Sequence, residues 1–403
     1  MGSLIHLTLG TLVVDRGKNS DFMDHGPLFQ RGDVCLIPYR SVDDDGEPLV
    51  QMKEGYARPL GSVLPRLELL GHTLDVARGD YAAVLDEHGV DPDVLPFERF
   101  IEALRRVDAG AVSPDYAEGD NFGEAFGLGV WEGLDLDKHA PYDPARSRIG
   151  TGEMLGYFHP WSALRLLAER PDNLVLPVTW DFADVVEGGW AEREAVDARL
   201  APEMRFLLVT EGSSDAHVLG KALALLRPEV ADFFRFVDME EGYPFSGTGN
   251  LHRFCQGLVG IGVLNRVVAI YDNDAEGVAR HAATARLKMP PNMRTMRLPD
   301  SERLRGFATV GPDGPGQGDI NGRAAAIECY LDLAWKASGP PRIRWNNYSA
   351  EVDRYHGELV GKGGYAARFL ALKRREQGYD FGGIEAILDA VVAECITIAE
   401  GGS

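Results

Sequence analysis

Four acidic residues follow two short apolar runs of this chain, and their positions predict a metal site. Phe206 to Val209 and Val267 to Tyr271 are apolar, β-branched runs that end at acidic, glycine-containing turns, which is typical of buried parallel strands. Ligands in open α/β sheets collect at the carboxyl ends of such strands. We therefore expect four carboxylates at one edge of a sheet: Glu211, Asp215, Asp272 and Asp274.

The residue types at this edge indicate which cation would bind. Carboxylates within a few ångströms of each other repel, so their pKa values rise unless a cation neutralises them. Oxygen ligands without cysteine or histidine favour Mg²⁺ or Mn²⁺ over Zn²⁺. Asp272 and Asp274 would share one face of a continuing strand, and a turn at Asn273 could also bring both side chains to one ion. The sequence thus predicts Mg²⁺ or Mn²⁺ as the cofactor.

At these residues the chain resembles the Toprim domain, the metal-binding α/β module of topoisomerases, bacterial primases and several nucleases. The pattern of that domain is a strand ending in Glu-Gly and a second strand ending in Asp-x-Asp-x-x-Gly. Glu211-Gly212 and Asp272-Asn-Asp-Ala-Glu-Gly277 match it without a gap. The resemblance implies an α/β fold, with a Toprim domain of parallel, Rossmann-like sheet and a C-terminal helical tail over residues 204–403. Its metal ligands would be Glu211, also a catalytic residue, with Asp272 and Asp274, and Asp215 in a second set.

Two further segments are similar to the nuclease branch of this family, the overcoming-lysogenization-defect nucleases. Asp319-Ile-Asn-Gly-Arg-Ala-Ala-Ala-Ile-Glu328 resembles a Gly-rich turn and Ile-Glu helix that add a metal-ligating carboxylate, with Asn321 as the expected cap. The segment around Lys362 resembles the one that carries their catalytic basic residue, which would stabilise transition-state charge. A solvent-facing Glu328 and a flexible surface Lys362 remain the alternatives.

Other enzyme classes lack their required residues. A primase of this kind carries a zinc module, whereas the four cysteines are scattered singly and form no Cys-x-x-Cys pair. Type IA topoisomerases need large arch domains for which 403 residues leave little room. Neither a Gly-x-Ser-x-Gly nucleophile elbow nor a Walker A loop occurs. The nuclease interpretation is therefore favoured over strand passage, serine hydrolysis and ATP hydrolysis.

Charge is distributed unevenly along the chain. The formal net charge of −21 argues against indiscriminate affinity for nucleic acid. The stretch from Arg280 to Arg375, however, carries 17 basic and 9 acidic residues, a balance of +8 that leaves −29 for the rest. Within it, Arg342 and Arg344 lie beside Trp345 and near Tyr348, a combination that suits backbone and base contacts. We expect nucleic acid, DNA or RNA, to bind there.

The first 200 residues predict a separate, mixed α+β and largely helical domain. Leu4 to Val14 and Val34 to Tyr39 suggest a small sheet. An apolar stripe from Leu67 to Val84 predicts one helix of roughly five to six turns, and Pro96 starts a second helix. Residues 109–147 are expected to form a loop anchored by Trp131, and a polar helical linker follows Gly189.

This region, residues 1–200, resembles the domain that accompanies Toprim in bacterial HEPN/Toprim-associated proteins, whose presumed setting is defence against phage. The resemblance rests on Leu4-Ile-His-Leu-Thr-Leu-Gly-Thr-Leu-Val-Val-Asp15, Gly17-Lys-Asn-Ser20 and the helical stretch after Arg58-Pro-Leu60. Arg66 and His72 fit the Arg-x(4 to 6)-His spacing of HEPN ribonucleases, but roughly 2.5 such matches arise by chance in this composition. We interpret them as a helix-surface arginine and a structural histidine.

Together these patterns predict a metal-dependent nuclease of the cytoplasm. The scattered cysteines fit a reducing compartment, and no apolar run approaches the roughly 18 residues of a membrane span. The alternative from another class is a catalytically silent Toprim module that senses nucleic acid or acts as a scaffold. Nucleic acid is the expected partner, no membrane is involved, and a homo-oligomer or a separate defence protein is a further possible partner.

Overall fold

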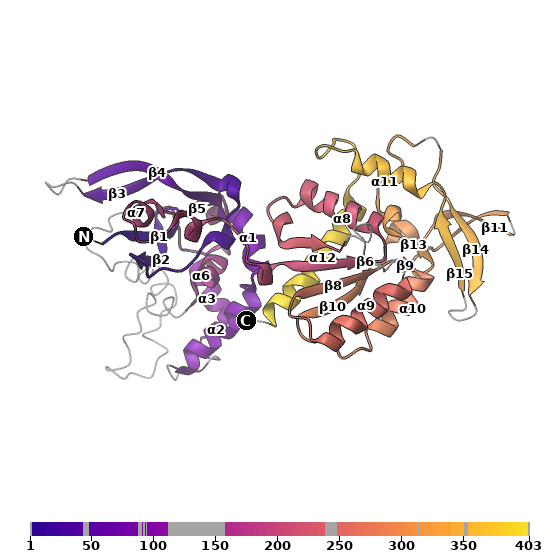
Figure 1. Ribbon diagram of the computed structural model, residues 1–403, viewed down its shortest axis with the longest axis horizontal. Coiled ribbons are helices and arrows are strands. Elements are labelled where there is room, and N and C mark those ends of the chain that lie inside the picture. The colour runs from indigo at the N-terminus through magenta and orange to yellow at the C-terminus, as the bar shows by residue number, and fades with distance from the viewer. Residues whose placement is uncertain are drawn as a thin grey trace. The chain divides into compact units, whose positions relative to one another are not determined.

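The computed structural model describes residues 2–42, 48–87, 91, 93, 95–111, 158–237, 248–312, 314–337, 339–349 and 354–401. The chain divides into two compact units, Met1–Leu200 and Ala201–Ser403, both drawn in Figure 1. Most of the expected loop at 109–147, including its anchor Trp131, lies outside the described residues. None of the helices within these ranges is long and apolar enough to cross a membrane.

The first unit holds a five-stranded antiparallel sheet (Figure 1). Strand β5 comes from a distant part of the chain and lies in the centre, where it pairs with both β1 and β4. Gly10 has a φ of 57° in the turn between the first two strands, a conformation that favours glycine. The strands, in the order β2-β1-β5-β4-β3, are β1 (Leu4–Leu9), β2 (Leu12–Lys18), β3 (Val34–Val42), β4 (Pro48–Pro59) and β5 (Pro177–Trp180).

The helices of the first unit differ from the expected pattern at one place. A single helix was expected from Leu67 to Val84, but the chain reverses at Gly71, whose φ is 97°, and the amide of His72 donates to the carbonyl of Leu67. The apolar spacing continues across this break because both helices bury their stripes in the same core. The helices are α1 (Leu60–Leu69), α2 (Leu74–Glu87), α3 (Phe97–Leu104), α6 (Pro160–Leu167) and α7 (Ala183–Glu187), and α3 begins after Pro96 as predicted.

Short 3₁₀ turns connect these elements. The polar linker expected to be helical after Gly189 contains only two of them, so that expectation was wrong: proline and extended residues interrupt the segment. In the first unit the 3₁₀ turns are η1 (Gly26–Leu28), η2 (Arg31–Asp33), η4 (Pro171–Val175) and η5 (Arg193–Val196). In the second unit they are η6 (Pro202–Met204), η7 (Ala231–Phe233), η9 (Glu302–Leu304) and η10 (Ile327–Tyr330).

The second unit is built on a four-stranded, wholly parallel sheet, which confirms the mixed α/β prediction for this half. Its two central strands, β6 (Phe206–Thr210) and β8 (Arg266–Tyr271), are the two apolar runs identified in the sequence. The outer strands are β7 (Phe234–Phe236) and β10 (Met293–Arg297), and the order is β10-β8-β6-β7. Because β6 and β8 are parallel neighbours, their carboxyl ends lie side by side.

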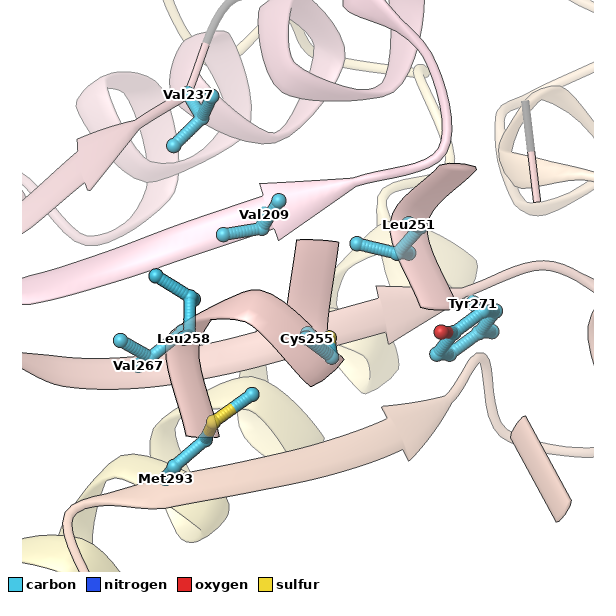
Figure 2. Close-up of a cluster of buried hydrophobic side chains, with 9 residues drawn as sticks. Val209, Val237, Leu251, Cys255, Leu258, Val267, Tyr271 and Met293 are labelled. Carbon is cyan, nitrogen blue, oxygen red and sulfur yellow. The ribbon is translucent and has the colours of Figure 1, made fainter. Parts of the chain in front are cut away.

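Helices cover both faces of this sheet (Figure 1). α8 (Ser213–Leu226) and α12 (Gly382–Glu400) pack together on one face, and α9 (Thr248–Ile261) and α10 (Ala275–Thr284) pack together on the other. Figure 2 shows the core beneath α9, where Leu251, Cys255 and Leu258 of the helix face strand residues. The strand residues of this cluster are Val209, Val267, Ala269, Tyr271 and Met293. Such a two-sided core fixes the strand ends that carry the acidic residues.

A second, smaller sheet completes the second unit. It has the order β12-β11-β14-β15, with β11 (Phe307–Gly311), β12 (Gly314–Gly318), β14 (Ile343–Ser349) and β15 (Arg354–Leu359). The short strand β9 (Asn273–Asp274), which follows β8, pairs with β13 (Ala324–Ala325), which follows β12. Helix α11 (Lys362–Leu370) follows β15. β15 contacts both α10 and β13. The second sheet therefore adjoins the edge where β8 ends.

Candidate metal and catalytic site

The carboxyl ends of β6 and β8 carry the acidic residues that the sequence singled out. Glu211 directly follows β6, and Asp272 directly follows β8. The backbone amide of Asp272 donates to Oε1 of Glu211 at 3.0 Å, which joins the two strand ends. A Cβ at Gly277 would lie 2.2 Å from the Asp272 carbonyl oxygen and 3.1 Å from Glu211 Oε1, so only glycine allows α10 to approach this junction.

Asp215 and Asp274 lie at the starts of the helices that leave these strands. Oδ2 of Asp215, in the first turn of α8, accepts a hydrogen bond from the amide of Gly212 at 3.1 Å. Gly212 is the N-cap of this helix. Oδ1 of Asp274, the N-cap of α10, accepts from the amide of Gly277 at 2.7 Å. Each carboxylate thus uses one oxygen to stabilise a helix N-terminus and keeps a second oxygen for other partners.

Burial raises the pKa values of all four carboxyl groups, and repulsion from neighbouring carboxylates adds to it. Removal from water is the largest cause for each; repulsion from Asp274 adds to it at Glu211, whose pKa rises to about 8. The pKa of Asp215 rises to about 6, with Glu328 as its main acidic neighbour. The pKa of Asp272 is held well above its usual value, and that of Asp274 is also raised. Such shifts mark a group of carboxylates that a cation would relieve.

The electrostatic neighbours divide the cluster into two pairs. Glu211 is repelled mainly by Asp274, whereas Asp215 is repelled mainly by Glu328. Asp272 is repelled by all four of these groups, with Asp215 and Glu211 the strongest. Asp272 is therefore the shared member between a Glu211–Asp274 pair and an Asp215–Glu328 pair.

Glu328 belongs to the cluster although it comes from a different element than expected. Its side chain is buried, with 4% of the residue exposed, so it does not face solvent. The helix predicted around it is a single 3₁₀ turn, η10, preceded by β13, which pairs with β9. Asn321 does not cap a helix; its Oδ1 accepts from the amide of Ser301 at 2.9 Å. The Ile327 to Ala334 spacing suited a helix, but pairing of β13 with β9 and tight turns replace it.

Two basic side chains approach opposite ends of the cluster. Lys362, exposed in the first turn of α11, lowers the pKa of Asp215 and so partly offsets burial and Glu328 there. His356 of β15 lowers the pKa of Asp274, against the larger effect of burial. His356 was not among the residues predicted from the sequence. The available signal was its place beside Gly357 in the strand β15, which contacts α10. The Asp215–Glu328 pair and the Glu211–Asp274 pair each have a basic side chain near them.

Asn273, between the two aspartates, is completely buried and makes a dense set of hydrogen bonds. Its Oδ1 accepts from the amide of Gly322 at 2.7 Å and from the guanidinium of Arg297. Its Nδ2 donates to Asp300 Oδ1 at 3.0 Å and to the Tyr330 hydroxyl at 3.2 Å. In the sequence Asn273 was only the residue of a possible turn, because its partners lie 24 to 57 positions away.

The residues proposed for nucleic-acid contact lie on the second sheet or, for Arg342, directly before its strand β14. Arg342 and Arg344 are exposed, and Trp345 is half-buried against Gly357 of β15. Tyr348 and Tyr355 are 53% and 50% exposed, and their rings form a T-shaped pair with centroids 5.3 Å apart. β14 and β15 therefore present exposed arginines and aromatic rings on the strands next to the carboxylate cluster.

Arg66 and His72 of the first unit have structural surroundings. Arg66 is fully buried rather than on a helix surface, and it donates to the backbone oxygens of Pro27 and Phe29 at 2.9 and 3.2 Å. His72 pairs with Ser162 through Nδ1 at 2.9 Å and stacks on His159. Arg66 and His72 contact different segments of the unit, so their spacing in the sequence does not bring them into one site.

The carboxylate oxygens of the cluster are ligands of the kind that a hard divalent cation prefers, although the side chains do not surround a single ion position. Within the described ranges, no three Asp, Glu, His or Cys side chains stand as ligands to a single metal ion. The clustered groups are nevertheless all carboxylates, with raised pKa values and one basic group at either end. Oxygen donors of this kind suit Mg²⁺ or Mn²⁺.

Comparison with known proteins identifies the first unit. Residues 1–203 match the family described as HEPN/Toprim N-terminal domain 1, which is half of the chain. No curated protein and no solved structure matches the chain. The match covers the region whose resemblance to HEPN/Toprim-associated proteins was recognised in the sequence, and it confirms that resemblance.

Proposed function

This chain belongs to the HEPN/Toprim N-terminal domain 1 family, and from that premise we propose that it is a metal-dependent nuclease. Its second unit would be a Toprim domain similar to those of the overcoming-lysogenization-defect nucleases, hydrolysing phosphodiester bonds in DNA or RNA. Defence of a bacterium against phage, in the cytoplasm, is the setting that the family resemblance suggests. A homo-oligomer or a separate defence protein would be the protein partner.

One observation carries this proposal: carboxylates from three distant segments converge where β6 and β8 end. Glu211 and Asp215 come from one strand and helix, Asp272 and Asp274 from the next, and Glu328 from η10. The pKa values of Glu211, Asp215 and Asp272 rise through burial and through repulsion from neighbouring carboxylates, which costs folding free energy that a purely structural site would avoid. Clustering of this kind marks functional sites.

The five carboxylates would hold Mg²⁺ or Mn²⁺. Asp272 lies electrostatically between the Glu211–Asp274 and Asp215–Glu328 pairs, which suits a shared ligand of two ions. Bound divalent ions supply activation of water and stabilisation of the leaving oxygen in phosphodiester hydrolysis. Glu211, whose Oε1 is fixed by the amide of Asp272, is the proposed catalytic carboxylate.

Lys362 is the proposed transition-state cation. Its position in the first turn of α11 places the ammonium group near Asp215, whose pKa it lowers. An exposed ammonium beside the cluster can contact a phosphate oxygen as negative charge develops, without being needed to bind the metal.

Arg342 and Arg344 are the proposed contacts to the nucleic-acid backbone. Both are exposed next to Trp345 on the second sheet, within the stretch whose formal balance is +8. The exposed Tyr348 and Tyr355 rings offer flat apolar faces on which unpaired bases can stack. Phosphate attraction by the arginines and stacking by the tyrosines would act on the same strand.

The rival function is a catalytically silent Toprim module that senses nucleic acid. It is favoured by the absence of three ready-placed metal ligands in the described part of the chain. Incubation of the purified chain with plasmid, linear duplex, single-stranded DNA and tRNA, each with Mg²⁺, Mn²⁺ or EDTA, separates the two. The nuclease proposal predicts cleavage of at least one substrate that EDTA abolishes. Binding of nucleic acid without cleavage under any metal condition would support the silent module instead.

A further inference from the structure

Asn273 connects segments that reach the cluster from different directions. Its amide group contacts the end of β10 through Arg297 and the following loop through Asp300. It also contacts the turn before β13 through Gly322 and η10 through Tyr330. The Tyr330 hydroxyl itself donates to the carbonyl of Pro299 at 2.7 Å. An amide supplies both donors and an acceptor, which is what these partners require and which a carboxylate or hydroxyl could not match.

The same contacts determine where Glu328 lies. The backbone of β9 pairs with β13, with Asn273 opposite Ala325 and Asp274 opposite Ala324. Glu328 follows β13 by three residues, and Tyr330 follows Glu328 by two, so the hydrogen bonds of Asn273 bracket the Glu328 segment on both sides. The Asn273 side chain bonds the segments of Arg297, Asp300, Gly322 and Tyr330. Glu211 and Asp215 belong to a separate segment that follows β6.

We propose that Asn273 is a positioning residue that holds Glu328 against the Asp272–Asp274 segment, and so completes the Asp215–Glu328 half of the metal site. This inference rests on the proposed function. Outer groups that orient metal ligands typically change metal affinity or activity by about 10- to 100-fold when removed. Loss of the Asn273 amide lets the Glu328 segment move away and leaves the Glu211–Asp274 pair in place.

Asn273→Ala tests the proposal against a matched asparagine in the same unit. Asn292→Ala removes two side-chain hydrogen bonds, fewer than Asn273 makes, to the carbonyls of Val263 and Asn265 at 2.7 and 2.8 Å, at the opposite ends of β8 and β10. In Mn²⁺ titration calorimetry, Asn273→Ala is expected to weaken binding about tenfold or more, with Asn292→Ala unchanged. Equal Mn²⁺ affinity in the two variants overturns the proposal. Tyr330→Phe is a milder second variant with a smaller effect in the same direction.

A double-mutant cycle shows whether Asn273 acts through Glu328. If it does, Asn273→Ala adds little to the loss of cleavage rate caused by Glu328→Gln but adds fully to that of Glu211→Gln, and the rate constant falls while KM for nucleic acid stays unchanged. Full additivity with Glu328→Gln overturns the positioning role, because a general loss of stability would act equally in both backgrounds.

A metal-free measurement separates failure of this inference from failure of the proposed function. Absence of Mn²⁺ binding and of cleavage in the unaltered chain refutes the nuclease proposal. The positioning claim is then decided by thermal unfolding in EDTA at pH 8. Glu328→Gln relieves repulsion with Asp215 and is expected to raise Tm by about 2 °C or more, and this rise should shrink in the Asn273→Ala background. An equal rise in both backgrounds contradicts it.

Discussion

Both units contain a cluster of titratable side chains, histidines in the first unit and carboxylates in the second. The two clusters differ in the partners that these side chains have. In the first unit, Trp161 donates its indole N–H to His25 Nδ1 at 3.0 Å and its backbone amide to His159 Nδ1 at 3.1 Å. The other ring nitrogen of His25 lies 2.8 Å from Asp15. His72 is bonded to Ser162. Each of these histidines therefore has a neutral or opposite-charged partner from within its own unit.

In the second unit the strongest electrostatic neighbours of Glu211, Asp215 and Asp272 are other carboxylates. Glu211 faces Asp274, Asp215 faces Glu328, and Asp272 faces them all. A cluster completed by its own fold contributes to structure, whereas a cluster dominated by one charge sign is the better candidate for binding an added cation. This difference is the reason to assign chemistry to the second unit and not to the histidines of the first.

The largest effect is expected from removing Asp272, the shared member of the cluster, together with Asp274. Asp272→Ala with Asp274→Ala should reduce cleavage by about 10³-fold or more, because the ligand shared by both proposed pairs and one member of the Glu211–Asp274 pair are lost. Plasmid cleavage with Mn²⁺ measures it. The control is Asp389→Ala with Glu394→Ala, which removes the same charge from α12, where these residues pair with Arg227 and Arg294. Equal cleavage by the two double variants would contradict the assignment.

Lys362 tests whether a cation beside the cluster acts in the transition state. Lys362→Ala should lower the rate at saturating substrate by about 10²-fold with little change in Mn²⁺ affinity. Lys373→Ala, which removes another exposed lysine of the same unit, should leave the rate unchanged. A rate unchanged by Lys362→Ala would return this lysine to the protein surface.

Arg342 and Arg344 test where nucleic acid is held. Replacing both with Glu should weaken binding about tenfold or more and reduce the slope of log affinity against log salt, since fewer phosphate contacts release counterions. Filter binding at several salt concentrations measures both. Arg235→Glu with Arg253→Glu makes the same charge change at exposed sites outside the basic stretch. Equal losses in the two variants would mean that only net charge matters.

The two clusters should respond oppositely to pH. Glu211 and Asp215 have folded-state pKa values of about 8 and 6, above their usual values, so their contribution is fully present below about pH 4 and is lost as pH rises through 6 and 8. In EDTA, the free energy of unfolding of the second unit should fall over that range. Glu211→Gln should remove the part lost near pH 8, as urea unfolding at pH 6, 7 and 9 would show. A flat profile would contradict the clustered arrangement.

The histidines of the first unit give the smallest effect, at acidic pH. Burial and the neighbouring His159 lower the pKa of His72 to about 4, and burial also lowers that of His159. Below about pH 6.5 the unfolded chain takes up protons that the folded unit does not, so stability should fall between pH 6.5 and 4. His72→Gln should flatten this loss in urea unfolding. An unaltered slope in the variant would place the acid sensitivity elsewhere.

The sequence was sufficient where local pattern and chain order determine the structure. Short apolar runs that end in acidic turns predicted β6 and β8, and parallel pairing then puts Glu211 beside Asp272. Glu328 and Lys362 could be named only through family resemblance, because no local spacing relates residues so far apart in the chain. Their proximity to Asp215 comes from tertiary contacts of η10 and α11.

The expectations that failed did so where tertiary pairing outweighs local periodicity. The stripe around Ile327 is helical in spacing, but the preceding Ala324 and Ala325 pair with β9 and leave room for one 3₁₀ turn. The Leu67 to Val84 stripe continues across Gly71 because two helices share a core. The role of Asn273 had no local signal, since its partners come from three later segments.

Calorimetric titration of the metal-free chain with Mn²⁺ at pH 7, in buffers of different ionisation enthalpy, tests the central claim most directly. Because the pKa of Glu211 is raised to about 8 and that of Asp272 is also high, metal binding must displace protons. The account predicts saturable binding with net proton release at pH 7, less release at pH 9, and neither in Asp272→Ala with Asp274→Ala. No binding by the unaltered chain, or the same binding and proton release in the double variant, would contradict it.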